Sequence, residues 1–251
     1  MSTATTWAAG TSTGRVRQLN EDSAYAGHWL YAVADGMGGH AAGEVASATV
    51  IEALTEYDAE AALGRLVEIL GAAVREANAA IRRRTEDDPD LRTMGTTLTA
   101  TLWSGHTFAL AHIGDSRAYR LRSGKLRLLT EDHVLHNLVG GAGTSPILAP
   151  IMSRYLDGRS DRSPDLGLRE ASSGDRYLLC SDGLSAVVPI PAVLGALESG
   201  DGPAQIIERL MELANGLGGP DNITAVLVDV AAQASGTALQ PMTLGAAAVL
   251  T

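Results

Sequence analysis

Four aspartates in the sequence stand where a short apolar run meets a glycine. They occur as Asp35-Gly36, Gly114-Asp115, Asp182-Gly183 and Gly219-Pro220-Asp221. The apolar runs beside them have the length and composition of buried strands. Because strand ends lie at the rim of a sheet, the four carboxylates are placed so that they could meet at one site.

Carboxylates gathered in a partly dry site raise one another's pKa and need a countercharge. Divalent cations supply it, and ligation by oxygen alone favours hard metals such as Mg²⁺ or Mn²⁺. A neighbouring glycine lets the backbone come close and can offer its carbonyl as a further ligand. An Asx turn is the better explanation of any single Asp-Gly pair. The fourfold repetition shifts the balance toward a metal site.

The elements that must position these groups follow from the hydrophobic period. Helical spacing predicts helices at 43–57, 63–81, 191–197 and 203–217. Apolar runs and a period of two predict strands at 30–34, 97–102, 107–113, 116–122, 126–129, 166–169, 177–180 and 223–230. This order indicates an α+β fold in which sheets pack on sheets and helices lie outside.

Composition narrows the class of protein. The chain has 251 residues, and its 29 acidic and 19 basic side chains give a net charge of -10. This disfavours non-specific nucleic-acid binding, whose affinity comes from basic residues that meet phosphates. The single cysteine excludes an intrachain disulfide and a thiolate metal cluster. With no signal-peptide pattern and no apolar run of about 18 residues, we expect a cytoplasmic monomer without membrane insertion.

We expect one domain over residues 1–230 and a C-terminal tail over 231–251. The tail contains no charged residue. Its apolar end at 244–250 is too short to span a membrane. We interpret the tail as an extra edge strand or a frayed end.

A series of segments, taken in order, resembles the motifs of the metal-dependent protein phosphatases, the type 2C Ser/Thr family. The segments are Gly14–Ser23, Val33–Glu44, Gly95–Thr97, Ile113–Tyr119, Thr130–His133, Cys180–Leu184 and Asp221–Thr224. The resemblance covers about residues 10–230. It implies a fold of two packed, mostly antiparallel β-sheets flanked by helices, which agrees with the α+β expectation.

The resemblance also implies a ligand set for two or three Mn²⁺ or Mg²⁺ ions. Asp35 would bridge two ions. The Gly36 carbonyl would hold the first ion, and Asp182 with Asp221 would hold the second. Asp115, with Asp182, would match the weaker third site of bacterial members.

Other roles carried over from the family concern water and substrate. Glu21 and Asp22 would hold metal-bound waters, and Arg17 would grip the substrate phosphate. Without the motif context, we would favour an ion pair between Arg17 and Glu21. Two roles are equally open for His40. It could protonate the leaving oxygen, or it could form a hydrogen bond with the backbone near a helix N-terminus.

The implied activity is hydrolysis of phosphoserine and phosphothreonine in proteins phosphorylated by a bacterial Ser/Thr kinase. Two metal ions lower the pKa of a bridging water, and the planar fork of Arg17 can bind two phosphate oxygens. The segment Leu135–Arg162 resembles a shortened form of the family's flap beside the active site, so flap-based specificity is not carried over.

Two alternatives remain open from the residues. Gly36-x-Gly38-x-x-Ala41 fits a dinucleotide-binding loop, although Asp35 would repel a pyrophosphate and no βαβ crossover follows. The other alternative is a non-catalytic regulator that binds phosphoproteins through an inactive site. The intact set of carboxylates argues against it.

Overall fold

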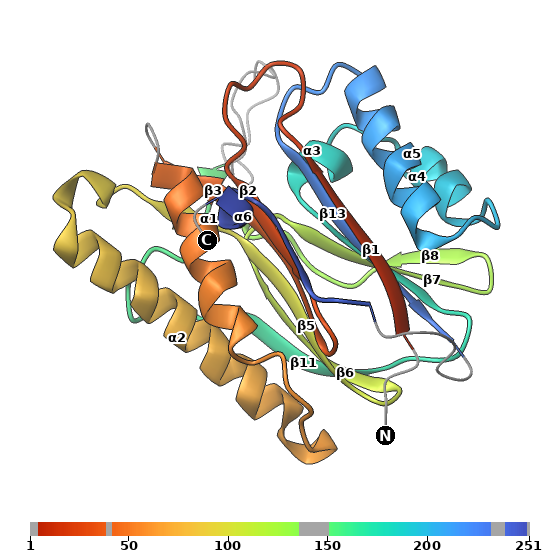
Figure 1. Cartoon of the computed structure of the whole chain (residues 1–251), viewed down its shortest axis with the longest axis horizontal. Helices are drawn as coiled ribbons and strands as arrows, with labels where there is room; N and C mark the ends of the chain where they lie inside the picture. Colours follow the sequence, from red (N-terminus) through yellow and green to blue (C-terminus); the bar gives the residue numbers. More distant parts are fainter. Residues whose placement is uncertain (1–4, 39–41, 136–150, 232–238, 250–251) are drawn as a thin grey trace, which may run out of the picture.

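The computed structural model describes residues 5–38, 42–135, 151–231 and 239–249. Two β-sheets pack face to face, and helices cover the outer face of each (Figure 1). Every strand pairing in the described residues is antiparallel. The α+β prediction is therefore confirmed. The dinucleotide-binding alternative is wrong, because that fold needs parallel strands joined by a crossover helix.

The first sheet has five strands in the order β1-β13-β12-β7-β8. Their bounds are β1 Thr5–Ser12, β7 Arg117–Arg122, β8 Lys125–Leu128, β12 Arg176–Cys180 and β13 Ile223–Val230. The two central strands β12 and β13 are almost wholly buried. Alternate side chains of these two strands lie in the core between the sheets and in the core under the helices, so both faces of the strands are covered.

The second sheet has the order β11-β6-β5-β3-β2-β14, with the short β4 paired to the end of β3. Its strands are β2 Asp22–Ala26, β3 Leu30–Met37, β4 Gly95–Thr96, β5 Leu98–Ser104, β6 Thr107–Ile113, β11 Asp165–Glu170 and β14 Met242–Gly245. A separate two-stranded sheet pairs β9 Val134–Leu135 with β10 Ile151–Met152.

Helices lie on both outer faces (Figure 1). The second sheet is covered by α1 Ala42–Thr55, α2 Leu66–Asp87 and α6 Ala246–Val249, with the short 3₁₀ helices η1 Leu63–Arg65 and η2 Pro89–Leu91 flanking α2. The first sheet is covered by α3 Asp182–Ser185, α4 Ile190–Leu197 and α5 Pro203–Gly216. In α2, Leu66, Leu70, Val74 and Ile81 recur at helical spacing and are buried, which docks this helix on the sheet.

An aromatic cluster between the sheets fixes their relative position. Trp103 stacks on Phe108 with ring centroids 4.4 Å apart. Tyr177, from the first sheet, meets the Phe108 ring edge-on at 4.9 Å. Large aromatic surfaces contribute strongly to burial, so this contact holds the two sheets as one unit.

Several elements differ from the prediction. The strands β1 and β2 were not foreseen, because the small and polar residues of β1 give no clear alternation. The tail agrees with one of the two expectations for it, because part of it forms the edge strand β14, which the short helix α6 follows; residues 232–238 lie outside the described residues. Among the described residues, no helix is both long and apolar enough to cross a membrane.

Candidate metal centre

One cavity of about 340 Å³ collects most of the predicted site residues. Asp35 and Gly36 lie near the end of β3, Asp115 follows β6, Asp182 begins α3, and Asp221 precedes β13. The cavity is lined by Arg17, Glu21, Asp35, Gly36, Met37, Gly38, Asp115, Met152, Asp182, Asp221 and Asn222. Carboxylates from separate parts of the chain therefore share one space, as their places at strand ends indicated.

Two threonines fix the backbone of Asp35. The Asp35 carbonyl accepts hydrogen bonds from the Thr97 amide and the Thr96 hydroxyl, both at 2.9 Å. The Asp35 amide donates to Thr97 Oγ1 at 3.0 Å. Leu156 pairs with Thr96 through two backbone hydrogen bonds of 2.9 Å, so the segment after β10 is tied to the same strand end.

Glycine at two positions allows the walls of the site to approach closely. A Cβ at Gly36 would lie 2.1 Å from the Gly43 carbonyl oxygen and 2.5 Å from that of Glu21. A Cβ at Gly183 would lie 2.0 Å from the Asn222 carbonyl oxygen. Any side chain there would push apart the elements that carry the carboxylates.

The carboxylates of the site outnumber the positive charge near them, which comes from Arg17. Burial, and then repulsion from neighbouring carboxylates, raises the pKa of Asp35 well above its usual value. The same two causes raise the pKa of Asp182, and they raise that of Asp115 to about 6. Asp22 and Asp35 are direct cross-strand partners, an arrangement in which like charges destabilise a sheet.

The donor set fits a hard divalent cation. All the acidic ligands offer oxygen, and Oδ1 of the fully buried Asp22 has no hydrogen-bond partner in the part of the chain that the structure describes. Within the described residues, no three acidic, histidine or cysteine side chains are gathered closely enough to hold an ion as they stand. Uncompensated carboxylates repel each other, so an ion would have to draw them together.

Asp22 lies behind the cavity and is held by the first sheet. Ser181 donates from Oγ to Asp22 Oδ2 at 2.8 Å, and the Thr224 amide donates to the same serine oxygen at 3.0 Å. Burial is the main cause that raises the pKa of Asp22, to about 7. The Asp22 side chain therefore lies next to the residues that line the cavity and does not line it itself.

Arg17 pairs with Asp221 and not with Glu21. Its Nη2 donates to Asp221 Oδ2 at 2.7 Å, while the Asn222 amide donates to Asp221 Oδ1 at 2.8 Å. The ion pair with Glu21, favoured without the motif context, is thus wrong. The chain between Arg17 and Glu21 is not helical, so the spacing of four does not bring the two side chains together.

Asn222 was missed as a site residue. Its side-chain oxygen accepts from the Glu21 amide at 2.8 Å, and its Nδ2 donates to the carbonyls of Thr13 and Leu19 at 3.0 and 2.8 Å. One buried amide thus fixes both ends of the loop that carries Arg17. The one feature of the sequence that could have pointed to Asn222 is its position directly after Asp221.

His133 supports the loop that carries Asp115. Its Nδ1 accepts from the Gly114 amide at 3.1 Å, and its Nε2 lies 3.1 Å from Asp165 Oδ2 and also contacts Arg154 Nη2. Arg154 donates to the other oxygen of Asp165 at 2.9 Å.

Residues 151–162 of the predicted flap are described. His40 and residues 136–150 lie outside the described residues.

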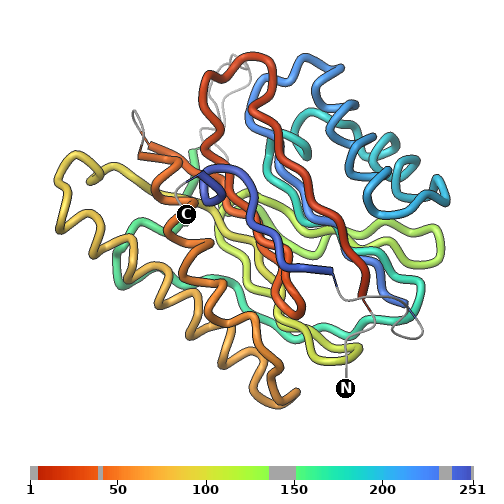
Figure 2. Tube along the Cα trace, viewed as in Figure 1, coloured from red at the N-terminus to blue at the C-terminus, as the bar shows by residue number. Residues whose placement is uncertain are grey.

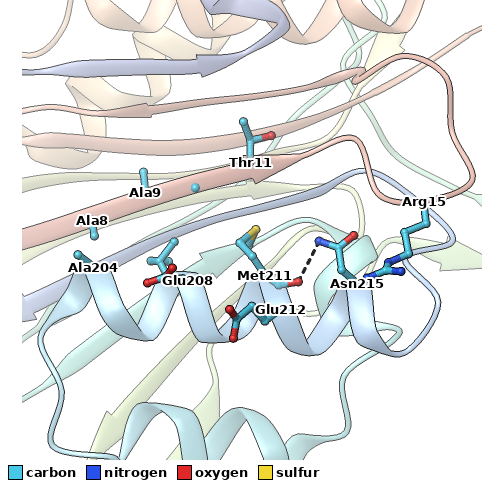
Figure 3. Close-up of a pocket in the computed structure, with 11 residues that line it drawn as sticks. Ala8, Ala9, Thr11, Arg15, Ala204, Glu208, Met211, Glu212 and Asn215 are labelled. Atoms are coloured by element: carbon cyan, nitrogen blue, oxygen red, sulfur yellow. Dashed lines mark hydrogen bonds between the residues drawn. The ribbon is translucent and has the colours of Figure 1, made fainter.

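A larger groove of about 710 Å³ runs between β1 and α5 (Figure 3). Its charged lining residues are Arg15, Glu208 and Glu212. It shares no lining residue with the cavity of the carboxylates. This groove has no predicted ligand, so size alone does not identify the site.

Comparisons with known proteins show which proteins the whole chain resembles. The chain is 49% identical over 231 residues to "Serine/threonine protein phosphatase PstP" of Mycobacterium tuberculosis, covering 89% of this chain and 45% of that protein. It is 35% identical to "Serine/threonine phosphatase stp" of Listeria monocytogenes, covering 87% and 93%. The chain thus spans about half the length of the mycobacterial relatives it matches.

Solved structures show the same fold. The crystal structure of the Mycobacterium tuberculosis phosphatase PstP/Ppp superposes with a TM-score of 0.84 at 47% identity, covering 90% of this chain and 99% of that one. The PstP catalytic domain in complex with two manganese ions gives 0.82 at 50% identity, covering 90% and 98%. The sequence profile described as protein phosphatase 2C matches residues 9–228, and the chain belongs to that family.

Proposed function

We propose that this protein is a metal-dependent phosphatase that hydrolyses phosphoserine and phosphothreonine in proteins. The observation that carries the proposal is the single cavity in which Asp35, Asp115, Asp182 and Asp221 lie together beside Arg17. The family membership and the named relatives support the same activity. The intact carboxylates disfavour the alternative of a regulator with an inactive site.

We assign the ligands of two or three Mn²⁺ or Mg²⁺ ions to this chain's own oxygens. Asp35, the Gly36 carbonyl, Asp182 and Asp221 hold two ions, and Asp115 with Asp182 serves a third. Glu21, which lines the cavity, and Asp22, which lies behind it, orient water beside these ligands. When bound, such ions supply positive charge that lowers the pKa of water and polarises a phosphoryl oxygen.

Arg17 binds the substrate phosphate in this proposal. Its guanidinium is half-exposed, and among the described residues it bonds one carboxylate oxygen, Oδ2 of Asp221, which leaves its other donors available to a phosphate. A planar fork that meets two phosphate oxygens fixes the phosphorus and stabilises the charge of the transition state. His40 is proposed to protonate the leaving Ser or Thr oxygen or to orient the substrate.

The partners follow from this chemistry. The substrates are proteins phosphorylated by a bacterial Ser/Thr kinase, and we place the activity in the cytoplasm, where such kinases find ATP. The net charge of -10 disfavours nucleic acid as a partner. We propose residues 1–230 as the catalytic domain and a monomer as the active form.

Hydrolysis of an aryl phosphate tests the activity. We expect turnover with Mn²⁺, none with excess chelator, and recovery when Mn²⁺ is restored; a panel of phosphopeptides then identifies the preferred residue. Metal-independent turnover would contradict the metal centre. Phosphopeptide binding without turnover would support the regulator instead.

A further inference from the structure

The C-terminal segment Met242–Val249, formed by β14 and α6, lies against the strand β2, which begins at Asp22 directly after Glu21. It follows residue 228, where the match to the family profile ends. β14 pairs with β2 from Met242 opposite Ala26 to Gly245 opposite Ser23. In Figure 2 this blue segment runs beside the red N-terminal strands. Ala246 and Ala247 are buried, which anchors the segment.

A chain of hydrogen bonds runs from this segment to the metal centre. The Ala247 amide donates to Ser23 Oγ at 3.1 Å, and Ser23 Oγ lies 2.9 Å from Ser47 Oγ. Ser47 Oγ donates to the Glu21 carbonyl at 2.5 Å. Since each hydroxyl has one proton and Ser47 donates its proton to Glu21, Ser23 donates to Ser47, and each of the two hydroxyls donates once and accepts once.

The last acceptor of this chain also holds a proposed metal ligand. The Glu21 carbonyl accepts a second hydrogen bond from the Gly36 amide at 3.2 Å. The segment thus reaches the backbone of Glu21 and, through it, that of Gly36. The serines involved are fully buried, so no water competes for these hydrogen bonds.

The same segment also makes a close contact with Asp22, the residue after Glu21. Gly245 has a φ of 72°, and a Cβ there would lie 2.1 Å from the Asp22 carbonyl oxygen. Only glycine allows this approach, because it has no Cβ and accepts a positive φ. Asp22 in turn lies directly across from Asp35.

We propose that Met242–Val249 is a positioning element of the metal centre. By fixing the backbones of Glu21 and Asp22, it holds Gly36 and Asp35 where they bind the cation and so raises the affinity for Mn²⁺. The inference rests on the proposed metal ligands. The simpler role of β14 is to cover the edge of the sheet, which would affect stability but not affinity for the cation.

Mn²⁺ affinity, measured by electron paramagnetic resonance on the full chain well below its Tm, separates the two roles. Gly245→Ala introduces a clash with the Asp22 carbonyl, and Ser23→Ala breaks the chain of hydrogen bonds without adding an atom. Gly200→Ala is the matched control, because Gly200 also has a positive φ, of 83°, but a Cβ added there would meet no other atom within 4 Å. Asp182→Ala reports on the proposed ligands themselves.

We expect Gly245→Ala and Ser23→Ala each to weaken Mn²⁺ binding at least fivefold, and Gly200→Ala to leave it within twofold while lowering the Tm. If Gly245→Ala does not fold, Ser23→Ala decides alone. Unchanged affinity in the folded variants, with a loss in Asp182→Ala, would overturn the positioning role and leave the proposed function standing. Unchanged affinity in Asp182→Ala would instead contradict the metal ligands.

Discussion

Arg17 Nη2 donates to Asp221 Oδ2 across 2.7 Å, which joins the proposed phosphate clamp to a proposed metal ligand. The Arg17 side chain is 51% exposed and that of Asp221 is 34% exposed. Pairs this open to water contribute little to stability. Arg17 can therefore exchange Asp221 for a phosphate oxygen at a small cost in free energy.

Replacement of Arg17 should impair substrate binding more than the fold. We predict that Arg17→Ala mainly raises KM for a phosphothreonine peptide, by about tenfold to a hundredfold, because a hydrogen bond to a charged group contributes about 1.5–3 kcal/mol. Steady-state kinetics with Mn²⁺ measure this. Arg15→Ala is the control, since Arg15 lines the groove beside α5. A KM unchanged in Arg17→Ala would show that Arg17 does not bind phosphate.

The stability of the metal-free protein should fall as pH rises from about 4 to 7. Burial raises the pKa of Asp115 to about 6 and that of Asp22 to about 7, whereas the ordinary pKa of an aspartate, which holds in the unfolded chain, is 3.8. At a pH between 3.8 and these raised values, the folded state therefore binds more protons than the unfolded state. His112 opposes this, because burial lowers its pKa to about 4 and only the unfolded state is protonated between 4 and 6.5.

Asp115→Asn isolates the carboxylate from this opposing group. In chelator, we predict that the variant gains on the order of 1–3 kcal/mol relative to wild type between pH 4.5 and pH 7.5, as followed by denaturant unfolding. Added Mn²⁺ should flatten the pH dependence of the wild type. A constant difference between the two proteins across this range would mean that Asp115 has no raised pKa.

His133→Ala should lower both stability and turnover. The change removes the acceptor of the Gly114 amide, and a buried donor left unpaired costs about 1–3 kcal/mol. The freed loop carries Asp115, so activity should fall as well. His106→Ala is the control, since His106 is exposed. Denaturant midpoints and turnover rates that match in the two variants would argue against a supporting role for His133.

Local patterns were enough to predict much of the fold. The alternation at 97–102 and the apolar run at 223–230 correspond to β5 and β13 because these strands are long and strongly patterned. By contrast, β1 is rich in small and polar residues, and its pairing with β13 depends on a partner more than 200 positions away. A single-sequence pattern carries no information on such a contact.

In the cavity too, some features could be predicted from the sequence and others could not. Asp35, Asp115, Asp182 and Asp221 could be proposed from their places beside glycines at strand ends. The pairing of Arg17 with Asp221 could not, because it depends on a loop conformation fixed by Asn222. The connection from Ala247 to Glu21 likewise exists only once the tail has packed against β2.

Metal-dependent turnover by the wild type and by Asp182→Ala tests whether the carboxylate cavity holds the metal ions of a phosphatase. Asp182 lines the cavity at the start of α3, and removal of its carboxylate should remove a shared ligand of the proposed ions. With a phosphothreonine peptide and Mn²⁺, we predict phosphate release by the wild type, none in excess chelator, and a loss of at least a hundredfold in Asp182→Ala with an unchanged circular dichroism spectrum. Wild-type rates in the folded Asp182→Ala variant would show that the carboxylate cavity is not the metal centre of the reaction.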